Sequence, residues 1–307
     1  MPILLVAILL FLLAPDSLFT ESPQDGFSKN ESREKLVAPG AKVERLATGF
    51  GFLEGPIAND AGDIYFTDIP NNVIHIWTSD HRLETFREDS GGANGLAFLD
   101  PNTLVVCEGG NRRLTAITLD GDVTVLADEF EGKKLNSPND LWIDPKGGIY
   151  FTDPRYGNRD DLELDGEYVF YLSPDREKLI IVVDDLIRPN GILGSPDGKT
   201  LYVADRSGNA NYAYAINEDG TLSNKTFFST EGSDGMTMDS KGNLYITSPH
   251  QEPYFRVSIY SPSGIKLEEI ITPEKPGNVH FGGKDGKTLF IPARTSLYAI
   301  KMRVQGI

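Results

Sequence analysis

The sequence contains one cysteine among 307 residues, Cys107, so no disulfide can form within the chain. Histidine is also scarce, and the four histidines show no zinc-ligand spacing such as His-Glu-x-x-His. The Gly-x-Ser-x-Gly motif that presents the nucleophile of many serine hydrolases does not occur. These absences exclude a disulfide-stabilised scaffold and give no support to a serine nucleophile or a histidine-bound zinc. Cys107 follows Leu104, Val105 and Val106, which is typical of a buried strand.

Basic residues are outnumbered, because 29 Lys and Arg residues stand against 45 Asp and Glu residues, a net charge of −16. This charge disfavours nucleic acid and anionic membrane surfaces as partners. It is compatible with a bound cation or a neutral small substrate, and also with a surface that is acidic only for solubility.

The longest apolar run, residues 3–13, is too short to span a bilayer comfortably. With the polar residues that follow it, this run resembles the hydrophobic region of a signal peptide. It is preceded by no Lys or Arg and followed by no Ala-x-Ala cleavage site, so an uncleaved membrane anchor is the alternative. We therefore expect an exported protein, periplasmic or secreted, with a signal peptide or anchor at residues 1–20 and a flexible linker at residues 21–40.

One pattern recurs along the rest of the chain: a polar residue, a short strand, a turn with Gly or Pro, and a second strand. In residues 135–153 it reads LNSPNDLWIDPKGGIYFTD. Six copies occur, and their leading polar residues are 40 to 51 positions apart. These ring residues, as we call them, are Glu54, Asn94, Asn139, Asn190, Asp234 and Asn278. Their spacing is typical of the blades of a β-propeller.

No stretch shows a sustained helical period of apolar residues, so we expect an all-β fold. The last repeat supplies only three strands, whereas residues 43–47 form a strand without a hairpin partner. The sequence therefore predicts a six-bladed β-propeller over residues 41–307. In it, the N-terminal strand closes the last blade and leaves no open sheet edge.

Every ring residue carries a side-chain oxygen, and equivalent positions of the inner strands of a propeller face its centre. Glu54 and Asp234, with the amide oxygens of Asn139 and Asn190, would form an all-oxygen ligand set with two negative charges. Such a set suits one divalent cation, with Ca²⁺ as the first choice and Mg²⁺, Mn²⁺ or Zn²⁺ as alternatives. Alternatively, Asn and Asp at strand starts only cap backbone groups of tight loops. The six-fold recurrence favours the metal interpretation.

Four ordered motifs carry a resemblance to a known family. They are Glu54-Gly-Pro, Ser137-Pro-Asn-Asp140, Arg188-Pro-Asn-Gly191 and Asp234-Gly-Met. Together they resemble the gluconolactonase, senescence-marker-protein (regucalcin) and luciferin-regenerating-enzyme family, over about residues 41–300. The stretches FTDPRYG at 151–157 and FGGKDGKTLF at 281–290 are similar to its bacterial gluconolactonase branch. That branch usually has a His after the acid of Cys-Glu, where this chain has Gly109.

The resemblance implies a metal-dependent hydrolase that opens a sugar lactone, such as glucono-1,5-lactone, to the aldonic acid. It implies Glu54, Asn190 and Asp234 as metal ligands, and Asn139 as a ligand or a substrate-facing residue. We expect Asp234 to act also as the general base toward the attacking water. The expected substrate-binding residues are Asn94, Asn139, Arg112 and Tyr156.

Two other functions stay open. A related metal-dependent propeller enzyme that hydrolyses organophosphates or aryl esters would need a more apolar pocket. A non-catalytic propeller would keep the metal for structure only and bind a partner. His280, two residues after Asn278, is a further candidate for the lining of the pocket.

Overall fold

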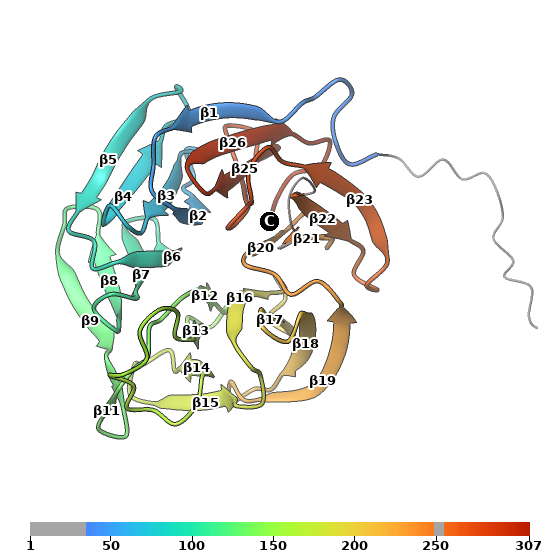
Figure 1. Cartoon of the computed structure of the whole chain (residues 1–307). Helices are drawn as coiled ribbons and strands as arrows, with labels where there is room; N and C mark the ends of the chain where they lie inside the picture. The colour runs from blue at the N-terminus through green and yellow to red at the C-terminus, as the bar shows by residue number, and fades with distance from the viewer. Residues whose placement is uncertain (1–34, 249–254) are drawn as a thin grey trace, which may run out of the picture. The chain divides into compact units, whose positions relative to one another are not determined.

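The computed structural model describes residues 35–248 and 255–307. Every regular secondary-structure element in this part of the chain is a β-strand. They form six four-stranded antiparallel sheets arranged around a common centre (Figure 1). The predicted all-β, six-bladed propeller is therefore confirmed. Within the same residues there is no helix that is long and apolar enough to cross a membrane.

The sheets are taken as blades 1 to 6 in chain order, and each is given from its innermost strand outward. Blade 1 comprises β2 (Leu53–Ala58), β3 (Ile64–Asp68), β4 (Val73–Trp77) and β5 (Leu83–Glu88), and blade 2 comprises β6 (Ala93–Asp100), β7 (Thr103–Glu108), β8 (Arg113–Thr118) and β9 (Val123–Ala127). Blade 3 comprises β12 (Leu141–Ile143), β13 (Ile149–Asp153), β14 (Tyr168–Leu172) and β15 (Leu179–Val183), and blade 4 comprises β16 (Pro189–Gly194), β17 (Thr200–Asp205), β18 (Ala210–Ile216) and β19 (Leu222–Ser229). Blade 5 comprises β20 (Met236–Met238), β21 (Leu244–Ser248), β22 (Arg256–Tyr260) and β23 (Lys266–Ile271), and blade 6 comprises β24 (His280–Gly282), β25 (Thr288–Ala293), β26 (Ser296–Lys301) and β1 (Glu44–Thr48). A small hairpin of β10 (Glu129–Phe130) and β11 (Lys133–Lys134) lies between blades 2 and 3 in the sequence.

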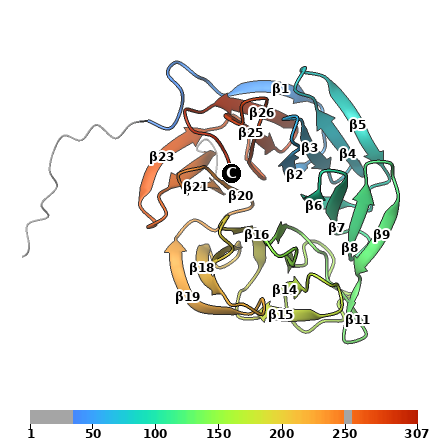
Figure 2. The same ribbon diagram turned by 180° about the vertical axis from the view of Figure 1, so that it is seen from behind.

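The N-terminal strand closes the last blade, as the sequence predicted. β1 pairs antiparallel with β26, and the pairs run from Glu44 with Ala299 to Thr48 with Ser296. Both views show β1 beside β26 at the outer edge of blade 6 (Figures 1 and 2). The pairing supplies the fourth strand of this sheet and covers its edge, which would otherwise be open to another chain.

The propeller also holds a few residues before β1. The Leu36 backbone N–H donates to the Glu268 carboxylate at 2.7 Å, and Ala38 N–H donates to the Lys301 carbonyl at 3.0 Å. Leu36 is buried in the core of the last blades. These contacts fall inside the segment 21–40 that the sequence suggested as a linker. Residues 1–34, with the expected signal peptide or anchor, lie outside the described residues.

The core lies between neighbouring blades. Cys107 of blade 2, for example, is fully buried in one cluster with Phe151 and Phe170 of blade 3. Burial raises the pKa of the Cys107 thiol well above its usual range, so this side chain is apolar filler. Because each blade is covered on both faces, second strands such as β13 and β21 are buried at every residue. Their sequences, IYFTD and LYITS, correspondingly begin with three apolar residues without alternation, and the two polar residues at the end of each are buried as well.

The aspartates that end the second strands of blades 1, 3 and 4 fix the loops that lead to the centre. Each accepts two or more backbone N–H groups at 2.7 to 3.1 Å from the loop that leads into the inner strand. The donors are Gly51 and Phe52 for Asp68, Asn136 and Ser137 for Asp153, and Ile187 and Arg188 for Asp205. In each case the ring residue follows two positions later. The repeated acid therefore positions the ring residue of its own blade.

Removal of β1 should destabilise the propeller more than removal of the residues before it. A chain that begins at Phe50 loses β1, whose Leu46 and Ala47 pack against the core of blades 1 and 6. We expect its melting temperature to fall by at least about 5 °C below that of a chain that begins at Lys35. A chain that begins at Lys42 keeps β1 and should lie between them. Equal melting temperatures for the chains that begin at Lys42 and Phe50 would show that β1 does not close the blade.

Asp205→Asn tests how the strand-end acids hold the loops. An amide NH₂ in place of one carboxylate oxygen would oppose the N–H groups of Ile187, Arg188 and Gly208. We expect the free energy of unfolding, measured by urea titration, to fall by about 1–3 kcal/mol. Asp197→Asn, in a solvent-exposed turn, is the matched control and should cost less than about 0.5 kcal/mol. Similar losses for the two variants would contradict this role of Asp205.

Candidate metal and substrate site

The ring residues of neighbouring blades are connected by hydrogen bonds, which places them in order around the centre. The links from blade 1 to blade 6 are Thr67 Oγ1 to the Asn94 carbonyl (3.1 Å), Gly95 N–H to the Asn139 carbonyl (2.7 Å), Thr152 Oγ1 to the Asn190 carbonyl (2.8 Å), Asn190 Nδ2 to Asp234 Oδ1 (2.8 Å) and Thr247 Oγ1 to the Gly277 carbonyl (3.2 Å). Gly277, which precedes the ring residue of blade 6, also lies against blade 1, because a Cβ at this position would be 2.6 Å from Glu54 Oε1. The structure thus brings together all six ring residues.

Most ring residues are followed by a glycine because the next blade comes very close. A Cβ on Gly55 would lie 1.9 Å from the Asn94 carbonyl oxygen, and one on Gly191 would lie 2.4 Å from the Asp234 carbonyl oxygen. Side chains at these positions would collide with backbone that cannot move aside. The exceptions are Asp140, which follows Asn139, and Val279, which follows Asn278.

Asn190 is held by its amide nitrogen. Nδ2 donates to Asp234 Oδ1 at 2.8 Å and to the Tyr156 hydroxyl at 2.7 Å. No described residue donates to the amide oxygen of Asn190, so this oxygen is left for a ligand. The Tyr156 ring is in turn covered by the Arg188 guanidinium, 5.0 Å from its centroid. Burial and the negative charge of Asp234 raise the pKa of Tyr156, so its hydroxyl stays protonated.

The carboxylates at the centre repel one another. Glu54 is buried, and its pKa lies well above the usual range because of burial first, and then because of the negative charges of Asp234 and Asp140. Hydrogen bonds from the Asn278 side chain and the Gly55 backbone lower the pKa of Glu54, but they offset only part of this increase. A bound cation would stabilise this arrangement by neutralising the charges.

Asp140 is a central residue to which the sequence analysis assigned no role in the site. It occupies the position at which the neighbouring repeats have glycine, and it accepts a hydrogen bond from the Leu141 N–H at 2.9 Å. Burial raises its pKa to about 7. The sequence signal was Asp in the place of that glycine, which puts a third carboxyl group beside Glu54 and Asp234.

The residues fit a hard divalent cation. Glu54 and Asp234 supply carboxylates, and Asn139 and Asn190 supply amide oxygens, which is the donor chemistry that Ca²⁺ and Mg²⁺ prefer. No described residue hydrogen-bonds the Asn139 side chain. In residues 35–248 and 255–307, no group of three or more His, Cys, Asp and Glu side chains is placed to hold a metal ion. The set therefore depends on its amide oxygens.

The expected substrate-binding residues differ in how many hydrogen bonds their side chains already make within the protein. Asn94 is half-buried on the ring, and no described residue hydrogen-bonds its amide. Tyr156 lies beside Asn190 at 2.7 Å. Arg112 instead donates to the carbonyls of Leu135 and Asp161, so much of its hydrogen-bonding capacity serves to hold loops together. Each role in substrate binding stays a prediction.

His280 is the first residue of β24, and burial lowers its pKa to about 4. It is therefore neutral near pH 7 and adds no positive charge to the ring. Among the described residues, no hydrogen bond or ion pair joins His280 to a ring side chain, so a place in the pocket lining stays a prediction.

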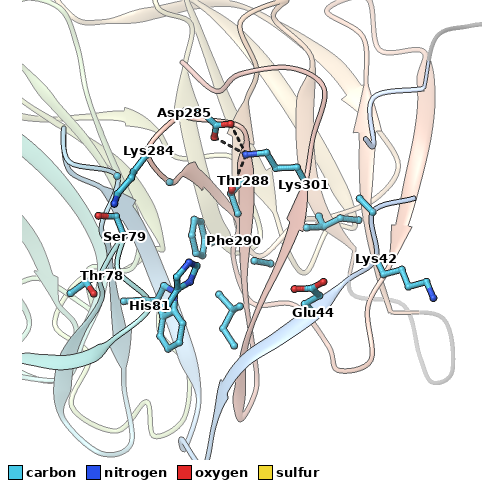
Figure 3. Close-up of a pocket in the computed structure, with 17 residues that line it drawn as sticks. Lys42, Glu44, Thr78, Ser79, His81, Lys284, Asp285, Thr288, Phe290 and Lys301 are labelled. Atoms are coloured by element: carbon cyan, nitrogen blue, oxygen red, sulfur yellow. Dashed lines mark hydrogen bonds and ion pairs between the residues drawn. The ribbon is translucent and has the colours of Figure 1, made fainter. Parts of the chain in front are cut away.

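A separate cleft of about 510 Å³ opens on the outer side, where β1 and β26 meet blade 1 (Figure 3). Its wall includes Leu46, Trp77 and Phe290, and two of its three lysines are paired with acids. Lys301 contacts Asp285, and Lys284 contacts Asp80. The cleft contains none of the ring residues, so it does not provide the oxygen set found at the centre.

Comparison with known proteins gives a consistent picture. The SMP-30/Gluconolactonase/LRE-like region matches residues 52–295. The gluconolactonase of Zymomonas mobilis is 31% identical over 299 residues, which cover 86% of this chain and 82% of that protein. Lactonase drp35 of Staphylococcus epidermidis is 31% identical over 302 residues, which cover 91% and 86%. A solved gluconolactonase from Xanthomonas campestris superposes with a TM-score of 0.79 at 29% identity, and covers 87% of this chain and 91% of its own. The chain therefore belongs to the SMP-30/gluconolactonase/LRE-like family.

Proposed function

We propose that this protein is a metal-dependent lactonase that hydrolyses a sugar lactone of the glucono-1,5-lactone type to the open acid. The observation that carries the proposal is the convergence of Glu54, Asp234, Asn139 and Asn190 at the centre of the propeller. The relatives from Zymomonas and Staphylococcus, named gluconolactonase and lactonase, support lactone hydrolysis.

Glu54, Asn190 and Asp234 would hold a divalent cation, with Asn139 as a fourth ligand or a substrate contact. Bound there, the cation would polarise the lactone carbonyl and lower the pKa of a bound water. Calcium is the first choice, and magnesium, manganese and zinc are alternatives.

Asp234 is the base in this proposal. Its Oδ1 accepts a hydrogen bond from the Asn190 amide, whereas Oδ2 accepts none in the described part of the chain and has only the ion-pair contacts of Lys275 at 3.5 Å and Arg206 at 3.7 Å. Oδ2 can therefore take the proton of the attacking water. Glu54 is the other carboxylate among the ring residues, but burial and its two acidic neighbours raise its pKa. Asn94 and Asn139 have amides without a described partner and can bind sugar hydroxyls, and Tyr156 and Arg112 would border the substrate.

The polarity of the ring favours this substrate over the alternatives. An aryl ester or an organophosphate with apolar groups would leave the Asn94 and Asn139 amides without hydrogen-bond partners, which is unfavourable. A non-catalytic propeller would not need a carboxylate such as Asp234, one oxygen of which accepts no hydrogen bond from the described residues. We also propose export, supported by the apolar segment at residues 3–13, and fractionation of host cells tests it.

Removal of the metal should abolish lactone hydrolysis. We expect chelator-treated protein to hydrolyse glucono-1,5-lactone at least about 100-fold more slowly, and Ca²⁺ to restore the rate. The same protein should be assayed with Mg²⁺, Mn²⁺ and Zn²⁺, and against an aryl ester and an organophosphate. Full activity after chelation would contradict metal dependence. Turnover of the ester or organophosphate without any lactone would favour the related hydrolase instead.

A comparison of Glu54→Gln with Asp234→Asn should separate ligand from base. Each variant removes one of the two ring carboxylates and should weaken Ca²⁺ binding at least about tenfold in calorimetry. At saturating Ca²⁺ we expect Glu54→Gln to recover most of its turnover, whereas Asp234→Asn should stay at least about 100-fold slower. Glu84→Gln, on the exposed edge of blade 1, controls for the lost charge. Recovery of Asp234→Asn at saturating metal would show that Asp234 is only a ligand.

A further inference from the structure

Two cationic side chains converge on the outer oxygen of Asp234. Arg206 Nε lies 3.7 Å and Lys275 Nζ lies 3.5 Å from Asp234 Oδ2. Arg206 directly follows β17 of blade 4, and Lys275 belongs to the segment before β24 of blade 6. The two side chains are 20% and 18% exposed, and that of Asp234 is 14% exposed. The cations are therefore beside the centre of the propeller and are only partly open to water.

Asp234 is the only acid with which either cation is paired in the described part of the chain. The other arginines nearby have acids of their own. Arg188 pairs with Glu167, and Arg112 pairs with Asp161. One carboxylate at the centre therefore serves as counter-ion to two positive charges.

The proposed metal competes for the same carboxylate. When Glu54 and Asp234 hold a divalent cation, their two negative charges balance its two positive charges. Arg206 and Lys275 then keep two positive charges without a counter-ion. Partly buried charges are stable only when they are paired or hydrogen-bonded. A negatively charged group from outside the protein would supply the missing partner.

We propose that Arg206 and Lys275 form a subsite for an acidic group of the substrate, so that the favoured lactone carries a carboxylate or a phosphate besides its lactone ring. The proposal deepens the lactonase function and rests on it. Carboxylate and phosphate share the required chemistry, because a guanidinium can bind either through two N–H groups and an ammonium adds a point charge.

A different role would be to stabilise the negative charge that develops on the lactone carbonyl oxygen. Every lactone, neutral or acidic, would then depend equally on Arg206 and Lys275. The two roles differ in substrate preference, so kinetics with matched substrates can distinguish them.

The kinetic test compares glucono-1,5-lactone with its 6-phosphate and with a glucaric acid lactone. We expect the wild-type kcat/KM to be at least about tenfold higher for one of the acidic lactones than for the neutral one. Which acidic lactone is preferred tells phosphate from carboxylate. Arg206→Gln and Lys275→Gln should each lower the acidic-to-neutral ratio at least about fivefold. Arg206→Lys keeps the charge but loses the paired N–H groups, so it should lower the ratio less than Arg206→Gln does. Lys284→Gln removes a charge at the outer cleft and should leave this ratio within about twofold.

An equal loss on neutral and acidic lactones would overturn the proposal, and so would a wild-type protein that does not distinguish them. The variants should be confirmed as folded by their melting temperatures. Arg206→Lys preserves the charge and covers the case in which Arg206→Gln fails to fold. If Arg206→Lys is folded but loses the preference for acidic lactones, while Lys275→Gln keeps that preference, the proposal is also overturned.

Binding provides a readout that does not need turnover. Calorimetry on the Ca²⁺-loaded protein should show binding of 6-phosphogluconate or glucarate that is at least about tenfold tighter than binding of sorbitol. This advantage should be lost in Arg206→Gln and Lys275→Gln. Both variants should also bind Ca²⁺ at least about threefold more tightly, because a neutral side chain no longer competes for Asp234.

The combined results separate the two proposals. If no lactone is hydrolysed but acidic sugars bind through the two cations, the lactonase function fails and the anion subsite stands. If lactones are hydrolysed but acidic sugars bind no better than sorbitol, the subsite fails and the lactonase function stands.

Discussion

The hydrogen bonds between neighbouring blades at the centre are the constraint on which the site depends. Buried threonines at the ends of second strands, Thr67 and Thr152, donate to the backbone carbonyls of the ring residues in the next blade. These backbone groups are thus satisfied inside the propeller. The side chains of Asn94 and Asn139 are not needed for that purpose, and their amides have no described partner. The same contacts that join the blades therefore leave polar side chains free for a ligand.

This arrangement collects negative charge where little water can screen it. Glu54, Asp140 and Asp234 influence one another, and the pKa of Glu54 and that of Asp140 are raised. Fixed positions on separate sheets prevent the carboxylates from moving apart, so the repulsion can be relieved only by protons or by cations. In the structure, Arg206 and Lys275 supply part of that positive charge at Asp234. A divalent cation would replace them there, because it carries two charges and can contact Glu54 and Asp234 together.

The sequence predicts the blades, the ring residues and the closing strand because each depends on a local repeat and on counting strands. The role of the strand-end acid Asp205, whose partners Ile187 and Arg188 lie in the loop before the inner strand, could not be seen from spacing. Side-chain contacts between different blades also could not be predicted from the sequence. Lys275 and Asp234 lie 41 positions apart in the sequence, and nothing in the repeat shows that a lysine before blade 6 reaches an acid of blade 5.

The net charge of the chain says little about the charge of the substrate. A total of −16 suggests a neutral or cationic ligand, but charges more than about 8 Å from a site are largely screened at physiological salt. What a substrate meets at the centre is set by the groups within that distance. With Glu54 and Asp234 engaged by a divalent cation, Arg206 and Lys275 would outnumber the one remaining carboxyl group, that of Asp140, and the local charge would have the opposite sign to that of the whole protein. The acidic surface would then act at long range only, and at low salt it would slow the approach of an acidic substrate without weakening its contacts once bound.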